Sequence, residues 1–164
     1  MENDLKKIDV AALDAPHRRA LEEVIGHELA TNQQLIISVI EVLKRKDSQV
    51  LAHAQQYLGE HQRLAFSSMT VYEIIRGLRA TQADRQLGQF LTTVGTSDVF
   101  PISLPVLMRA ADLWAEGRNG GHPHNDADLI VAATALDAKR VLVTGNTAHY
   151  SWITGLQVAD WRQK

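Results

Sequence analysis

The sequence predicts an α/β protein with a mainly parallel sheet that helices cover on both faces. Three short apolar runs, the β-branched LIISVIEVL, RLAFS and RVLVT, are separated by longer segments with apolar residues three and four apart. The runs are typical of strands, and the longer segments are typical of amphipathic helices. Strands that alternate with helices form parallel sheets, because each crossover helix returns the chain to the same edge.

Capping residues mark the helix ends in the first half of the chain. Asp14 and Pro16 predict the start of a first helix. Asp47 or Ser48 predicts the start of a second helix, and Gly59 predicts its C-terminal end. The other predicted elements of this half are strands over residues 35–43 and 63–67 and a helix over residues 70–80.

The second half of the chain continues the alternation. Expected in order are a helix that includes residues 87–94, a strand over residues 98–102, a helix over residues 103–116, a polar loop over residues 117–125 and an apolar helix from Asp126. The run RVLVT predicts a buried strand that ends at Gly145, and the final LQVADW predicts an edge strand. Ligand sites of parallel sheets lie beyond the carboxyl ends of the strands.

Composition excludes several classes of protein. The 164 residues suit one domain with a core of ordinary size. The absence of cysteine excludes disulfides, thiolate nucleophiles and zinc sites built on cysteine. The net charge of −2 means that nucleic-acid binding would depend on a local basic patch. No apolar run approaches the roughly 18 residues of a membrane span, so we expect a soluble, cytoplasmic protein.

Two aspartates open the apolar helix of HNDADLIVAATAL. Asp126 and Asp128 precede eight uncharged residues. Acids in the first turn of a helix stabilise its exposed N–H groups, which is sufficient reason for a pair of them there. The alternative is that one of them points to the carboxyl edge of the sheet and binds a divalent cation.

Two further polar residues follow predicted strands. Glu73 ends the sequence TVYE, which matches a capping box in which its carboxylate reaches back to the backbone of Thr70. Asn146 directly follows VLVTG, where a turn residue is expected. Each of these residues is ordinary by itself. Together with Asp128, they place three polar groups at the ends of successive strands.

Four motifs, SSMTVYEIIRGLRA, NDADLIVAATAL, LVTGNTAHY and GLQVADW, give the sequence a family resemblance. In their order and spacing, over about two thirds of the chain, they resemble the PIN-domain ribonucleases, in particular the VapC toxins of toxin–antitoxin pairs. The resemblance implies a PIN-like three-layer α/β/α sandwich. It also implies Mg²⁺- or Mn²⁺-dependent hydrolysis of RNA phosphodiester bonds, a homodimer and a cognate antitoxin.

The resemblance assigns roles to individual residues. Glu73 and Asp128 take the positions of catalytic acids that bind the metal. Asp126 is a neighbouring acid that joins them in the catalytic and metal-binding set, and Asn146 stands at a fourth catalytic position where members carry Asp or Asn. Hard oxygen ligands of this kind suit Mg²⁺.

The sequence departs from the family at the first strand, where members carry an aspartate. One register puts Ala30 at that position, a second lands near Leu35, and a third makes LIISVI the first strand with Glu41 at its end. Glu41 is therefore a conditional metal ligand, and a packed or solvent-facing glutamate is the alternative. The missing aspartate also supports an alternative function. In that alternative, the protein is a catalytically silent PIN-like module with a binding or regulatory role.

The N-terminal stretch is atypical for the family. Residues 1–33 carry the amphipathic helix DAPHRRALEEVIGHEL ahead of the PIN-like domain, for which we expect residues 34–164. Antitoxins often wrap their toxins with such a helix and tail. The stretch is therefore expected to be an antitoxin-like appendage, fused onto a toxin that has lost its own first strand.

The candidate RNA-binding cations are Arg76 and Arg79, beside Glu73, and Arg118 in the polar loop. A solvated helix face is the alternative for each of them. HPHNDAD resembles a His-x-His-x-Asp metal motif but lacks the histidine expected after the aspartate, so His122 and His124 are assigned to a loop. The tryptophans are expected to pack, and base stacking is an alternative for Trp152.

Overall fold

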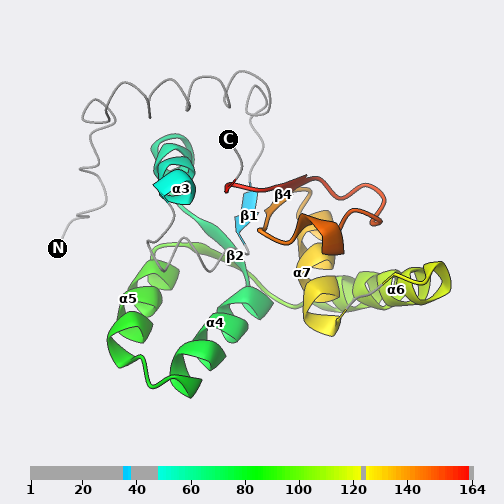
Figure 1. Cartoon of the computed structure of the whole chain (residues 1–164), viewed down its shortest axis with the longest axis horizontal. Helices are drawn as coiled ribbons and strands as arrows, with labels where there is room; N and C mark the ends of the chain where they lie inside the picture. Colours follow the sequence, from blue (N-terminus) through cyan, green and yellow to red (C-terminus); the bar gives the residue numbers. More distant parts are fainter. Residues whose placement is uncertain (1–34, 38–47, 123–124, 163–164) are drawn as a thin grey trace.

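The computed structural model describes residues 35–37, 48–122 and 125–162 (Figure 1). The strands are β1 (Leu35–Ile37), β2 (Ala65–Ser67), β3 (Asp98–Phe100), β4 (Val141–Val143) and β5 (Val158–Ala159). The helices are α3 (Ser48–His61), α4 (Ser68–Ala80), α5 (Asp84–Gly95), α6 (Leu104–Gly120) and α7 (Asp126–Asp137), with the 3-10 helix η3 (Thr147–His149). The helix expected from Asp14, the appendage and Glu41 lie outside the described residues.

Every strand pairing in the described part of the chain is parallel, which confirms the predicted sheet type. The hydrogen-bonded order is β1-β4-β5 in one sheet and β2-β3 in the other. β1 also contacts β2, so the two sheets lie side by side. The predicted edge strand is confirmed, because β5 pairs with β4 at the end of the order.

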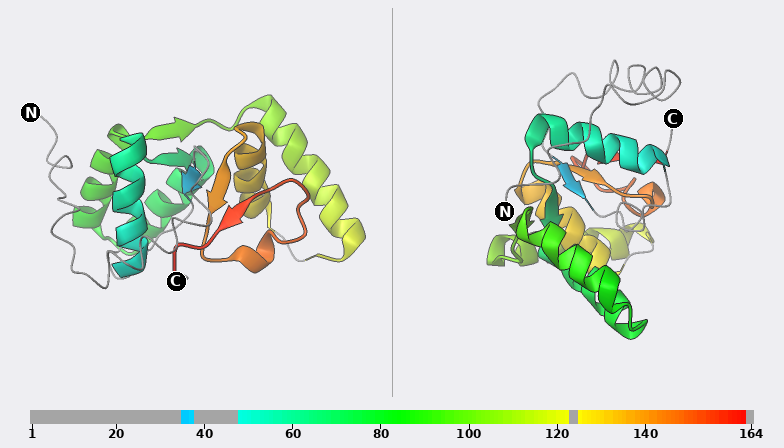
Figure 2. Two further views of the ribbon diagram at one scale, coloured as in Figure 1. Left: turned by 90° about the horizontal axis from the view of Figure 1, so that it is seen from above. Right: turned by 90° about the vertical axis from the view of Figure 1, so that its left-hand side faces the viewer.

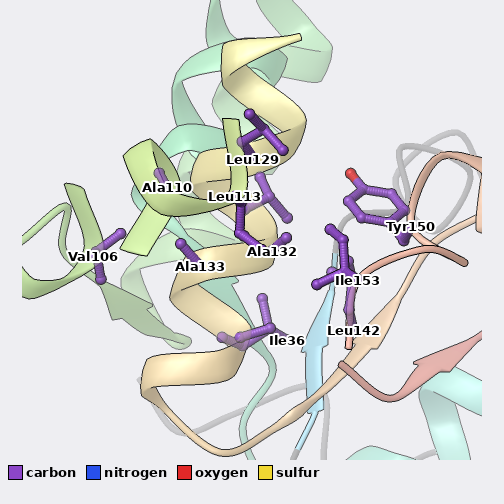
Figure 3. Close-up of a cluster of buried hydrophobic side chains, with 12 residues drawn as sticks. Ile36, Val106, Ala110, Leu113, Leu129, Ala132, Ala133, Leu142, Tyr150 and Ile153 are labelled. Carbon is purple, nitrogen blue, oxygen red and sulfur yellow. The ribbon is translucent and has the colours of Figure 1, made fainter. Parts of the chain in front are cut away.

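Alternating side chains of the sheet face two separate layers of helices. Ile36 and its partner Leu142 pack with α6 and α7 in one buried cluster (Figure 3). Val141 and Val143 point the other way and pack with Val50 and other apolar residues of α3. Because successive strand residues point to opposite faces, these clusters place helices on both sides of the sheet. The predicted α/β/α sandwich is thus confirmed.

Two predicted helix ends are wrong. α3 continues past Gly59 to His61, whose ring lies 4.3 Å from that of Tyr57, and Gln62 takes the left-handed conformation at its end with φ of 62°. α6 continues past residue 116 to Gly120, because Gly117 is buried and Gly121, with φ of 68°, caps the helix. Arg118 therefore lies in the last turn of α6, where a loop was predicted.

The capping box predicted for α4 is also wrong. Ser67 is the N-cap, and its hydroxyl accepts a hydrogen bond of 3.0 Å from the backbone N–H of Thr70. Thr70 is therefore the third helical residue, and Glu73 lies beyond the first turn. The carboxylate of Glu73 is thus not required to cap this helix. Among the described helices, none combines the length and the apolar character needed to cross a membrane.

Candidate active site

Asn125 sets the position of Asp128 at the start of α7. Its side-chain Oδ1 accepts a hydrogen bond of 2.8 Å from the backbone N–H of Asp128 and thereby caps the helix. Its Nδ2 donates a hydrogen bond of 2.7 Å to Oδ2 of the same aspartate. Helix capping is therefore done by the asparagine. The carboxylate of Asp128 is left to make contacts outside its own helix.

Those contacts come from the segment that follows β4. The hydroxyl of Tyr150 donates a hydrogen bond of 3.1 Å to Oδ1 of Asp128. Nδ1 of His149 lies 3.0 Å from Oδ2. A carboxylate oxygen can only accept a hydrogen bond, so Nδ1 of His149 carries the hydrogen and is the donor to Asp128. Asp128 is thus held by donors from two segments of the chain while its side chain remains 24% exposed.

Glu73 reaches the same region from α4, which packs against α7 (Figure 1). Burial raises the pKa of Glu73, and the nearby carboxylate of Asp128 raises it further, whereas Arg76 lowers it. Burial also raises the pKa of Tyr150, with smaller contributions from Asp128 and from the charge of Glu73. These mutual effects mean that the two carboxylates and the phenol lie close enough to interact.

Two carboxylates whose charges interact, as those of Glu73 and Asp128 do, suit a divalent cation. Their repulsion destabilises the charged pair, and a cation between them would relieve it. Mg²⁺ is commonly held by one or two carboxylates, with waters and phosphate oxygens as its other ligands. Within residues 35–37, 48–122 and 125–162, no three His, Asp or Glu side chains gather to form a larger metal site. A cation held by Glu73 and Asp128 alone would take its other ligands from water and phosphate.

The other sequence-predicted residues lie on the elements that carry or follow this pair. Asp126 is exposed in the first turn of α7. Asn146 is exposed at the start of η3, three residues before His149, and its backbone carbonyl accepts from the N–H of His149. On α4, the charge of Arg76 reaches Glu73. Arg79 is exposed one turn farther along the same helix.

Arg118 lies on a different element. Its guanidinium group is 5.2 Å from the ring centre of Trp114, on α6. In the left view of Figure 2, the C-terminal end of α6 lies on the same side of the molecule as η3. The charge of Arg76 lowers the pKa of Glu73, one of the candidate acids.

Sequence reasoning missed three of the residues that hold Asp128: Asn125, His149 and Tyr150. A signal for Tyr150 was present, because a tyrosine that is buried usually needs a partner for its hydroxyl. The signal for Asn125 was its place directly before two first-turn acids, which is the N-cap position. His149 had no such signal, since a histidine after a strand turn is ordinarily a surface residue.

The chain is similar in sequence to curated ribonucleases. It is 28% identical to ribonuclease VapC1 of Haemophilus influenzae strain R2866 over 127 residues, which cover 76% of this chain and 93% of that protein. It is 27% identical to the tRNA(fMet)-specific endonuclease VapC of Shigella flexneri over 100 residues, or 60% of this chain and 76% of that protein. No protein-family model matches the chain.

A solved structure shares the fold. The DNA-bound VapBC structure from Salmonella typhimurium contains a chain that superposes with a TM-score of 0.69 and 21% sequence identity. The match covers 79% of this chain and 98% of that chain. Almost the whole of the solved chain therefore has an equivalent here, and what the two share at this identity is the fold.

Proposed function

Because the chain has the fold of VapC-type PIN-domain proteins and is related in sequence to VapC ribonucleases, we propose that it is a divalent-metal-dependent endoribonuclease. The reaction is the hydrolysis of RNA phosphodiester bonds. The observation that carries the proposal is the fixed carboxylate of Asp128, held by Asn125, His149 and Tyr150 beside Glu73. A carboxylate oriented in this way is prepared to bind a cation.

Glu73 and Asp128 would hold the Mg²⁺ or Mn²⁺ ion. Hydrogen bonds already occupy part of the lone pairs of Asp128, and Oδ1, with one donor, has more capacity left than Oδ2, with two. Such a cation supplies electrostatic stabilisation of charge on the phosphate and on the leaving oxygen. Asp126 and Asn146 would support the site from its rim, and Glu41 would add a third carboxylate from beyond β1.

The proposed RNA contacts follow from the charge of the site. Two carboxylates repel phosphate, so nearby cations must offset their field. Arg76 is placed to do so because its charge acts on Glu73. Arg79 and Arg118, both exposed, would contact phosphates farther along the strand.

The proposed partners follow from the similarity of this chain to a solved VapBC structure. The similar solved structure is a VapBC assembly bound to DNA, and we expect a cognate antitoxin and a second copy of this chain to bind here. Residues 1–33 would form an antitoxin-like appendage to a PIN-like domain of residues 34–164. We place the enzyme in the cytoplasm with its RNA substrate.

RNA cleavage by the purified protein in Mn²⁺ tests the proposed function. The parent is expected to cleave single-stranded RNA, and Asp128→Asn is expected to lose that activity because the amide binds a cation poorly. Asp137→Asn is the matched control, since Asp137 is exposed at the other end of the same helix. Equal background in the parent and in Asp128→Asn would contradict the proposal and favour a catalytically silent PIN-like module.

A further inference from the structure

Two aromatic rings are stacked next to the candidate acids. The imidazole of His122 lies almost parallel to the indole of Trp152, with 6° between the planes and 5.1 Å between the ring centres. Parallel rings at this separation are offset, which is a favoured geometry for aromatic pairs. The two residues belong to segments far apart in the sequence, so the fold itself brings them together.

Hydrogen bonds position the indole of Trp152 and the backbone of His122. The indole N–H of Trp152 donates a bond of 2.9 Å to the carbonyl of His149, whose own ring contacts Asp128. The backbone N–H of His122 donates a bond of 2.9 Å to the carbonyl of Gly117, at the capped end of α6. His149 therefore connects the stack to Asp128, because its carbonyl accepts from Trp152 and its ring contacts the carboxylate.

The two rings differ in exposure. Trp152 is half-buried and packs against the main core cluster, whereas His122 is exposed. An indole that is fixed in the fold thus supports an imidazole at the surface. Planar, exposed and rigidly supported rings are the feature on which proteins that bind single-stranded nucleic acid stack bases.

We infer that His122 and Trp152 form a base-stacking subsite for an unpaired nucleobase of single-stranded RNA. The inference rests on the proposed function, because Glu73 and Asp128 define where the scissile phosphate lies. An unpaired base of the bound strand stacks on the imidazole of His122, whose other face lies against the indole of Trp152. Stacking reads ring area more than hydrogen-bonding groups, so the subsite favours purines without requiring one base.

Binding of a fluorescein-labelled single-stranded RNA, followed by fluorescence anisotropy in EDTA so that the RNA stays intact, tests the subsite. His122→Ala is expected to weaken binding by about 5- to 150-fold, the range for loss of one stacked base. His122→Tyr is expected to restore most of the affinity, because it returns a flat ring. Met108→Ala is the control, since Met108 is a large exposed side chain of α6 that carries no ring.

A set of RNAs with one abasic nucleotide each provides a measurement that needs no variant of Trp152, whose loss would disturb the core. One abasic position is expected to weaken binding by the parent as much as His122→Ala does, and to have little further effect on that variant. Unchanged affinity in His122→Ala would overturn the subsite. A loss that His122→Tyr does not restore would also overturn it, because a contact of histidine with phosphate explains that result.

These outcomes are separate from those of the proposed function. If the parent protein cleaves RNA in Mn²⁺ and His122→Ala binds RNA as tightly as the parent, the subsite is refuted and the proposed nuclease is not. Ring-dependent binding without cleavage refutes the nuclease and leaves the subsite standing. A parent that does not bind single-stranded RNA refutes the subsite directly.

Discussion

The hydroxyl of Tyr150 donates a hydrogen bond of 3.1 Å to Oδ1 of Asp128 and so connects the segment after β4 to the first turn of α7. The ring of Tyr150 is buried in the core cluster, and its hydroxyl points toward α7 (Figure 3). Packing of the core therefore determines where this oxygen lies. The position of the candidate metal-binding carboxylate depends on the core as well as on its own helix.

Tyr150→Phe removes this hydrogen bond and keeps the packed ring. We expect the free energy of unfolding to fall by about 1–2 kcal/mol, near the lower end for a hydrogen bond to a charged group because Asp128 is partly exposed. Urea unfolding measures the change, and Tyr72→Phe, at an exposed tyrosine of α4, is the control. In an Asp128→Ala background the effect of Tyr150→Phe should largely disappear. Equal losses in both backgrounds would show that the bond does not stabilise the fold.

Glu73→Gln is expected to raise the melting temperature at pH 7. The pKa of Glu73 is raised in the folded chain from its ordinary 4.5, so the folded state binds this proton more tightly than the unfolded state does. Stability therefore falls as pH rises from the ordinary pKa through the raised one, and it stays lower above that window. The glutamine variant avoids this loss, and its advantage should vanish below pH 4.5.

Thermal unfolding at pH 4 and at pH 7 measures the effect in Glu73→Gln. Glu60→Gln is the control, because Glu60 is exposed on α3. A melting temperature of Glu73→Gln below that of the parent at pH 7 would contradict the raised pKa of Glu73, which burial and, to a smaller extent, the charge of Asp128 cause.

Mn²⁺ is expected to stabilise the parent protein. A ligand that binds only the folded state adds about 2.7 kcal/mol when its concentration is 100 times its Kd. We expect a rise in melting temperature with Mn²⁺ that is absent in Asp128→Asn and reduced in Glu73→Gln, because each substitution removes a carboxylate ligand. Asp137→Asn should respond as the parent does. An equal rise in melting temperature in the parent and all three variants would show that Mn²⁺ binds at a site other than Glu73 and Asp128.

Two glycine substitutions are expected to change stability in opposite directions. Gly121 has φ of 68° as the cap of α6, where alanine is strained by about 1–2 kcal/mol. Gly88 lies in the middle of α5 with open space around an added Cβ, and alanine there should stabilise the helix by about 0.5–1 kcal/mol. Urea unfolding of both variants checks the pair, and a stabilising Gly121→Ala would contradict the left-handed conformation.

Local patterns in the sequence were sufficient for most of the fold. Alternating apolar runs predicted the parallel sheet, and the helix predicted from residue 103 begins at Leu104 as α6, with Ser103 as its N-cap. The errors fell at helix ends that depend on packing. Gly59 looked like a stop, yet α3 continues past it, and Gly121 ends α6 after Gly117 is buried in the helix. A glycine permits a helix to end, but tertiary contacts decide which glycine is used.

The sequence by itself determined the α/β class, because apolar spacing within each run indicates the type of element. The order of four motifs carried the PIN-like resemblance, and that resemblance implied the candidate acids Glu73 and Asp128. Only the tertiary structure decided what holds Asp128. Tyr150 and His149 lie 22 and 21 residues away from it and come from another segment. It also decided that the charges of Glu73 and Asp128 interact and that His122 stacks on Trp152. Such pairs form because parallel strands bring distant loops to one edge of the sheet, and residue spacing does not encode which loop side chains then meet.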